Sequence, residues 1–117
     1  MTFEAVLTGT SGNDNIIGTQ GRDLILGLGG NDYISGQNGN DCLVGGDGND
    51  TLMGDGYDDV IVGGNGDDYA AGGTGNDRTW AGAGNDFMNG QAGTDSCDGG
   101  AGTGDSQTTC EVVAGVP

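Results

Sequence analysis

The chain has 117 residues, of which 29 are glycine and 32% are apolar, and its formal net charge is −16. With only Arg22 and Arg78 as basic residues it lacks the footprint of a nucleic-acid-binding protein, and no apolar run is long enough to span a membrane. Because low hydrophobicity with high net charge is typical of chains that do not order themselves unaided, an external factor is expected to supply stability.

Residues 1–8 precede the repetitive part of the chain. Val6-Leu7-Thr8 match the last three positions of the repeat described next, so they are interpreted as the strand of a degenerate block. A stack of coils exposes its core and unpaired strand edges at each end. An N-terminal capping strand is therefore predicted for residues 1–8.

Residues 9–98 form ten consecutive nine-residue blocks, each with an aspartate at its sixth position. Glycine holds the first and the fourth position in nine blocks each, with Ala81 and Tyr57 as the exceptions. A strict period of nine does not fit an amphipathic helix at 3.6 residues per turn, so equivalent residues are predicted to stack in a coiled chain. The stacked aspartates are Asp14, Asp23, Asp32, Asp41, Asp50, Asp59, Asp68, Asp77, Asp86 and Asp95.

The blocks resemble the glycine-rich nonapeptide calcium-binding repeats of the RTX (repeats-in-toxin, haemolysin-type) family of secreted bacterial toxins, proteases and lipases. The family consensus is Gly-Gly-X-Gly-X-Asp-X-U-X with U apolar, and one matching block is Gly45-Gly46-Asp47-Gly48-Asn49-Asp50-Thr51-Leu52-Met53. The resemblance covers about three quarters of the chain. It implies an all-β, right-handed parallel β-roll with two short-stranded parallel sheets and Ca²⁺-binding turns on both edges. Six residues of each block turn, three form a strand, and two blocks make one coil.

The residue types support this geometry independently. Glycine at positions one and four permits the crowded or left-handed backbone of a tight turn. Alternation within the strand directs the eighth position inward. The eighth residues lose apolar character toward the C-terminus, so the first six blocks are expected to form the firmer part of the core; they are Ile16, Ile25, Ile34, Leu43, Leu52, Ile61, Ala70, Thr79, Met88 and Cys97.

The stacked carboxylates predict a metal requirement. In a parallel coil, blocks of equal parity lie about 4.8 Å apart, so five carboxylates line each edge. Two bare charges at that spacing repel by roughly 3 kcal/mol at an effective dielectric of 20. The available ligands are aspartate carboxylates and turn carbonyls, which suit Ca²⁺ better than Mg²⁺ or Zn²⁺. About eight Ca²⁺ ions, carrying roughly +16, are predicted between the coils, with the ten sixth-position aspartates as ligands.

Two blocks depart from the pattern. Block six has Tyr57 in place of glycine, so the sites that Asp59 shares with Asp41 or Asp77 are expected to be distorted. Block eleven, which starts at Gly99, places Asp105 one residue late. The repeat is therefore expected to end there, with Asp105 outside the ligand set and residues 99–117 forming a degenerate repeat and C-terminal cap.

The segment from Asp95 to Gly100, followed by Cys110, resembles the cysteine-bearing cap of some family members. The resemblance implies a Cys97–Cys110 disulfide, which would close a loop of about 14 residues and contribute about 3 kcal/mol. The alternative is two reduced thiols, with Cys97 as a small core residue. Cys42, at position seven of block four, is then unpaired on an outer face.

The outer face of the even blocks is predicted to be more apolar than that of the odd blocks. Such a face favours self-association or docking onto another domain, although apolar strand positions also follow from β propensity alone. The even-block face carries Leu24, Leu26, Cys42, Val44, Val60, Val62 and Trp80, with Arg78 among them, and the odd-block face carries Asn15, Ile17, Tyr33, Ser35, Thr51, Met53, Tyr69, Ala71, Phe87 and Asn89.

The sequence lacks the parts of a catalytic site: there is no histidine or lysine, and no serine or cysteine with a plausible base partner. The predicted function is a calcium-binding module of a secreted, extracellular protein, disordered without Ca²⁺ and structural when folded. The alternatives are a calcium-dependent ice-binding repeat and an adhesin or assembly segment. The ice-binding alternative comes from the family resemblance, because some repeats of the family display ranks of Thr and Asn from turns that read Gly-Thr-Gly-Asn-Asp. This chain has one such turn, at residues 73–77.

Overall fold

The computed structural model describes residues 3–100, 105–108, 110 and 112–114, which contain only strands and turns. Most strands are three residues long, as expected for a block in which six residues turn. The strands are β1 (Ala5–Thr8), β2 (Asn15–Ile17), β3 (Asp23–Leu26), β4 (Tyr33–Ser35), β5 (Cys42–Val44), β6 (Thr51–Met53), β7 (Val60–Asn65), β8 (Tyr69–Ala71), β9 (Arg78–Ala83), β10 (Phe87–Asn89), β11 (Ser96–Asp98), β12 (Ser106–Thr108) and β13 (Val112–Ala114).

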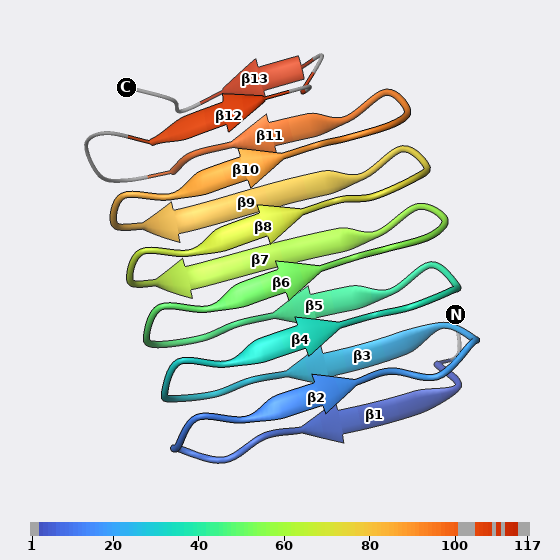
Figure 1. Cartoon of the computed structure of the whole chain (residues 1–117), viewed down its shortest axis with the longest axis vertical. Coiled ribbons are helices and arrows are strands. Elements are labelled where there is room, and N and C mark those ends of the chain that lie inside the picture. Colours follow the sequence, from blue (N-terminus) through green and yellow to red (C-terminus); the bar gives the residue numbers. More distant parts are fainter. Residues whose placement is uncertain (1–2, 101–104, 109, 111, 115–117) are drawn as a thin grey trace.

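The strands make two parallel sheets, one from the odd-numbered and one from the even-numbered strands. The first sheet has the order β1-β3-β5-β7-β9-β11-β13 and the second the order β2-β4-β6-β8-β10-β12. The arrows of the two sheets point in opposite directions, and turns connect the sheets at both edges of the stack (Figure 1). The predicted β-roll, with parallel sheets and turns on both edges, is confirmed.

Equivalent residues of alternate blocks pair across each sheet. Leu43 pairs with Ile25 on one side and with Ile61 on the other, a spacing of two blocks in each direction. Two blocks therefore make one coil, as predicted. The spacing changes at the C-terminal end, where Met88 pairs with Gln107 and Cys97 with Val113.

The interior is built from the eighth residue of each block, as predicted. Ile25, Ile34, Leu43, Leu52 and Ile61 are all 0% exposed. They form one cluster with Ala70, against which Leu7 and Ile16 pack, whereas Ala81, Met88, Cys97 and Cys110 form a second, smaller cluster. The larger cluster lies in the N-terminal part of the stack, in agreement with the expectation of a firmer core there.

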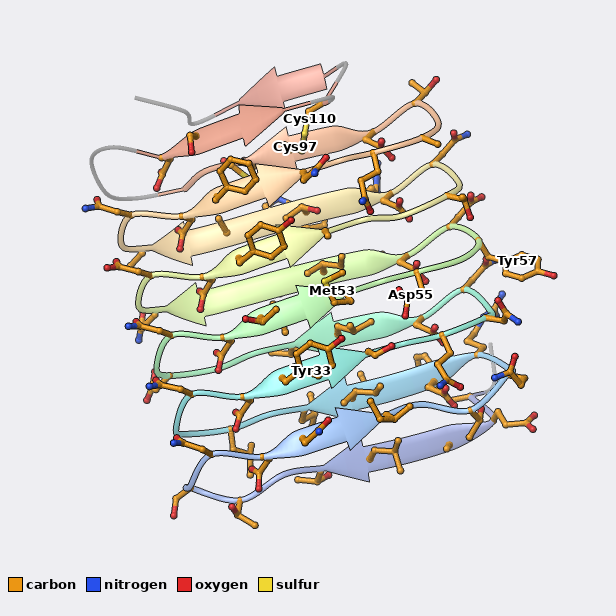
Figure 2. All side chains as sticks on the ribbon, viewed as in Figure 1. Tyr33, Met53, Asp55, Tyr57, Cys97 and Cys110 are labelled. Carbon is orange, nitrogen blue, oxygen red and sulfur yellow. A yellow bond between two sulfur atoms is a disulfide. The ribbon has the colours of Figure 1, made fainter. Side chains whose placement is uncertain are left out.

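The C-terminal end carries the covalent link. Cys97 and Cys110 form a disulfide with their Cα atoms 6.0 Å apart, and Cys42 is a free thiol (Figure 2). This is the pairing implied by the cysteine-bearing cap. Within the described residues no helix is long and apolar enough to cross a membrane.

Stacking of the turns makes specific demands on glycine. Gly48, at position four of block five, has φ +104°, and a Cβ there would lie 2.2 Å from the carbonyl oxygen of Gly30 in the coil before it. Gly12 holds the same position in block one, but its φ lies outside the left-handed region and its nearest neighbour would be the Thr10 Oγ1 at 3.6 Å. A side chain at position four would thus clash with the neighbouring coil in block five, whereas block one has room for it.

Gly48→Ala is expected to destabilise the folded chain by about 2 kcal/mol or more, because alanine meets both a disfavoured φ and a backbone oxygen that does not move away. Gly12→Ala is the matched control and is expected to leave stability unchanged or slightly higher. Urea unfolding in saturating Ca²⁺ measures both. Equal stability of the two variants would contradict the contact described at Gly48.

Candidate metal centres

The ten predicted aspartates lie at the ends of the turns, immediately before the strands or at their first residue. The aspartates of even blocks form a row along one edge of the stack and those of odd blocks form a row along the other edge. All of them from Asp23 to Asp95 are at most 5% exposed, and only Asp14 is partly exposed. The structure thus brings the predicted residues together, but in two buried rows rather than in compact clusters.

In each row the Oδ1 atom accepts a hydrogen bond from a backbone amide of the preceding coil. The amide of Asp32, for example, donates to Asp50 Oδ1 at 2.8 Å, and the amide of Asp50 donates to Asp68 Oδ1 at 2.8 Å. The described residues contain nine such steps, with distances of 2.8 or 2.9 Å. One oxygen of each carboxylate therefore joins neighbouring coils.

Asp105 belongs to the odd row. Its Oδ1 accepts the amide of Asp86 at 2.8 Å, and its side chain is 6% exposed. Sequence analysis placed Asp105 outside the ligand set because it comes one residue late; the structure places it in the hydrogen-bonded row, and the strand β12 follows in register with β10. Residues 101–104 of this block are outside the described residues.

The second carboxylate oxygen, Oδ2, is buried without a hydrogen-bond donor in most blocks. No described residue donates a hydrogen bond to Oδ2 of Asp32, Asp41, Asp50, Asp59, Asp68, Asp77, Asp86 or Asp105. A buried ionised oxygen without a partner is costly, and a protein interior normally pairs it or neutralises it. These atoms are the strongest indication of a cation site.

In six blocks the first residue, a glycine, lies against Oδ2 and a backbone oxygen of the next coil. A Cβ on Gly45 would lie 2.5 Å from Asp50 Oδ2 and 2.7 Å from the Gly63 carbonyl oxygen, so a carboxylate oxygen and a backbone oxygen of the next coil both lie against the same glycine. The same two contacts recur at Gly9, Gly18, Gly27, Gly54 and Gly63.

The donor set consists of hard oxygens. No group of three or more His, Cys, Asp or Glu side chains that could hold a metal occurs in the described part of the chain. A cation between two turns would therefore be held by row carboxylates together with backbone carbonyls, which is a ligand set that Ca²⁺ accepts. The residues present fit calcium.

A scan against protein-family models matches the RTX calcium-binding nonapeptide repeat, described as four copies, over residues 8–42, 44–79 and 72–104. The chain belongs to the RTX calcium-binding repeat family. Searches of the curated proteins and of the solved structures found no significant match. RTX nonapeptide repeats bind calcium, and their β-roll is a structural calcium-binding fold rather than a catalytic one.

Tyr57 does not disturb the RTX turn in which it replaces glycine. The amide of Asp41 donates to Asp59 Oδ1 at 2.9 Å, and the amide of Asp59 donates to Asp77 Oδ1 at 2.8 Å, as elsewhere in the rows. Tyr57 adopts φ +73° itself, and its ring, 61% exposed, points away from the edge of the stack (Figure 2). The expected distortion is therefore absent from these hydrogen bonds, and the strain is carried by the tyrosine backbone.

Position five of the RTX block was missed by sequence analysis. Asn or Asp occupies it in eight of the ten blocks, and only Arg22 and Thr94 depart from this. The amide of Asn49 donates to Asn31 Oδ1 at 2.8 Å, and the amide of Asp67 donates to Asn49 Oδ1 at 2.8 Å. These bonds run from the later coil to the earlier one, opposite to those of the aspartate rows. The repeated Asx at position five was the signal that would have identified them.

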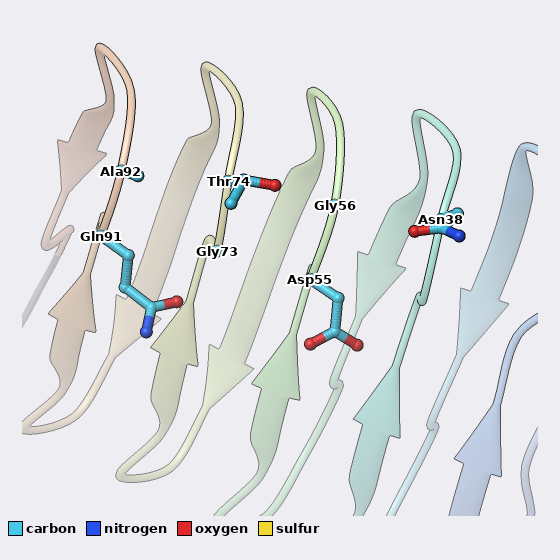
Figure 3. Close-up of a pocket in the computed structure, with 7 residues that line it drawn as sticks. All are labelled: Asn38, Asp55, Gly56, Gly73, Thr74, Gln91 and Ala92. Atoms are coloured by element: carbon cyan, nitrogen blue, oxygen red, sulfur yellow. The ribbon is translucent and has the colours of Figure 1, made fainter.

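A groove of about 430 Å³ runs along the outside of the even-block edge and is separate from the carboxylate rows. It is lined by the second and third residues of blocks four, six, eight and ten, with Asn38, Asp55, Thr74 and Gln91 as its polar side chains (Figure 3). The Asp55 carboxylate accepts a hydrogen bond from Ser35 Oγ at 2.5 Å. The groove is shallow.

Burial raises the pKa of six row carboxyls above the ordinary value of 3.8. The pKa is about 7 for Asp41, Asp68 and Asp77, about 6 for Asp50 and Asp86, and about 9 for Asp59. Charges of neighbouring row aspartates raise it further, and the backbone amide that donates to Oδ1 lowers it. Without a cation the folded coil thus binds protons more tightly than the unfolded chain does.

Acid is therefore expected to favour the metal-free fold. Between pH 4 and pH 7 the unfolded aspartates ionise while several folded ones keep their protons, so stability falls as pH rises through this range. In excess chelator, circular dichroism is expected to show more β structure at pH 4 than at pH 8, with sedimentation at each pH to exclude aggregation. A signal independent of pH would contradict the uncompensated burial of the carboxyls.

Tyr57→Gly is expected to stabilise the calcium-loaded roll by about 0.5–1 kcal/mol. Relief of the left-handed backbone, about 1–2 kcal/mol, exceeds the entropic cost of glycine, about 0.5–1 kcal/mol. Chemical denaturation in saturating Ca²⁺ measures the change. Tyr57→Ala is the control, because it removes the ring and keeps the strain; a similar gain in this variant would assign the effect to the ring instead.

Proposed function

We propose that this chain is a structural RTX module of an extracellular protein, which folds into its β-roll when Ca²⁺ binds between coils. The buried, unpartnered Oδ2 atoms carry this proposal. The chain has 18 acidic residues against two basic ones, so its own side chains offer few cations to compensate these atoms. The RTX family is typical of secreted proteins, which supports the extracellular location.

Calcium is far more concentrated outside a cell than in the cytosol, so the folding of such a module would depend on which side of the membrane it lies. If each site has a dissociation constant of about 0.1 mM, as in extracellular modules, then about 1 mM Ca²⁺ stabilises the fold by about 1.4 kcal/mol per site. Over about eight sites this amounts to roughly 10 kcal/mol, comparable with the whole stability of a small domain. At cytosolic, sub-micromolar calcium the contribution nearly vanishes. The chain is thus proposed to stay unfolded inside the cell and to fold after export.

Calcium titration followed by calorimetry and far-ultraviolet circular dichroism tests the proposal. A large gain of β structure is expected at millimolar Ca²⁺, with several ions bound per chain and little effect of Mg²⁺ at the same concentration. Equal β content in excess chelator and in millimolar Ca²⁺ would reject calcium-induced folding.

Asp50→Asn tests the role of a single row carboxylate. The asparagine oxygen can still accept the Asp32 amide, so the variant removes the charge and keeps the link between coils. One ion fewer is expected to bind, and the folded state is expected to lose about 1.4 kcal/mol at 1 mM Ca²⁺. Asp47→Asn is the matched control: Asp47 is exposed, outside the rows, and accepts a bond only from Asn65 Nδ2 at 3.0 Å among the hydrogen bonds described. An unchanged ion count in Asp50→Asn would remove Asp50 from the ligand set.

The alternative functions receive no specific support. The third residues of the even blocks, at the outer edge, are Gln20, Asn38, Gly56, Thr74 and Ala92, which do not form a regular threonine rank of the kind expected for ice binding. On the even-block face, Trp80 is 42% exposed and Arg78 lies 5.9 Å from its ring centroid. Self-association through this face stays a prediction, which sedimentation in saturating Ca²⁺ addresses.

A further inference from the structure

We infer that Thr10 and Thr19 take the place of metal in the first coil, so that the turns of blocks one and two hold their aspartates without Ca²⁺. The residue at position two then determines whether a turn of this chain binds an ion. The inference rests on the proposed function for the later turns and identifies which turns carry it out.

The carboxylates of the first two blocks are satisfied by hydrogen bonds within their own turns. The amide of Thr10 donates to Asp14 Oδ2 at 2.6 Å, and its hydroxyl donates to Asp14 Oδ1 at 3.0 Å. Block two repeats the arrangement: the amide of Thr19 donates to Asp23 Oδ2 at 2.6 Å and its hydroxyl to Asp23 Oδ1 at 2.7 Å. The Oδ2 atoms of Asp14 and Asp23 thus have the donor that later blocks lack.

Backbone conformation explains why this arrangement is confined to the first coil. Position two has positive φ in each of blocks three to eleven, including non-glycine residues such as Leu28 at +73° and Gln37 at +67°. Thr10 and Thr19 do not have positive φ. Because a β-branched side chain disfavours the left-handed region, threonine keeps the turn in the other conformation, in which its amide faces the carboxylate.

The threonine hydroxyl also supports the rest of the turn. Thr10 Oγ1 accepts the amide of Gly12 at 3.1 Å, and Thr19 Oγ1 accepts the amide of Gly21 at 3.2 Å. Gly12 and Gly21 hold position four, and they lack the positive φ that Gly30, Gly39 and Gly48 adopt at this position. Positions two and four therefore change conformation together, and one threonine, through its amide and its hydroxyl, satisfies three backbone or carboxylate atoms of the turn.

A self-satisfied first coil suits the end of a metal-assembled stack. In the first coil the strand of block one has no earlier strand beside it and that of block two has only β1, so no complete nonapeptide block lies before either of them in its own sheet. Hydrogen bonds from threonine make the end independent of calcium, and the next coil can add to it. Such a coil is a cap in the sense required of solenoid termini.

Two substitutions on the same edge test this in opposite directions. Thr10→Gly gives block one the glycine of a calcium-binding turn, and one additional ion per chain is expected by calorimetric titration. Leu28→Thr places threonine in block three, directly above block one, and one ion fewer is expected; the Leu28 side chain is 47% exposed, so its loss removes little packing. Ser11→Gly introduces glycine beside position two and is expected to bind as many ions as the unaltered chain.

The outcomes separate this inference from the proposed function. If the unaltered chain binds several Ca²⁺ ions and neither Thr10→Gly nor Leu28→Thr changes their number, the role of position two is rejected while the calcium-folded module stands. If Thr10→Gly does not fold in Ca²⁺ by circular dichroism, the ion count of Leu28→Thr decides alone. If the unaltered chain binds no Ca²⁺, the proposed function fails and this inference fails with it.

Discussion

The structure depends on burying a row of ionised oxygens between coils. Each coil step leaves a carboxylate oxygen such as Asp50 Oδ2 inside the protein without a donor among the described residues. The other oxygen is committed to the link between coils, so the carboxylate cannot turn outward without breaking that link. A carboxylate buried in this way is costly unless a proton or a metal ion neutralises it.

This constraint accounts for the composition of the chain. Gly45 leaves room for a carboxylate oxygen and a carbonyl oxygen where a side chain would otherwise stand. The interior takes one residue per block, such as Leu43 or Leu52, because six residues of every nine are used in turns. So thin a core buries little apolar surface, which is why a cation at the oxygen-rich edges is proposed to supply the remaining cohesion.

Much of the architecture was predictable because the period of nine fixes it. The inward eighth position, the two-block coil, the parallel sheets and the Cys97–Cys110 link all follow the sequence pattern or the family resemblance. The errors arose where one residue changed the local backbone. Asp105 lies in its row although it comes one residue late, and Tyr57 leaves the row intact because its own backbone accepts the strain. Counting positions reveals neither, since it assigns each residue a place without regard to the backbone conformation.

The distinct first coil was also hidden in the sequence. Thr10 and Thr19 read as ordinary variation at a position where Leu28, Gln37 and Asp55 also replace glycine. The dihedral angles separate the threonines from the others, because the side chains without a branch at Cβ enter the left-handed region and the β-branched ones do not. The ligand set of a repeat protein is therefore not fully given by its most regular residue.

The opposing directions of the two hydrogen-bond rows limit how such a chain can lengthen. At each step the row aspartate accepts from the coil before it, while the position-five side chain accepts from the coil after it. Duplication of a complete coil restores both sets of bonds at the new junction. Duplication of a single block would instead move every later strand into the opposite sheet and exchange the edges of all later turns. Growth and loss by pairs of blocks therefore keeps every later block in its own sheet and at its own edge.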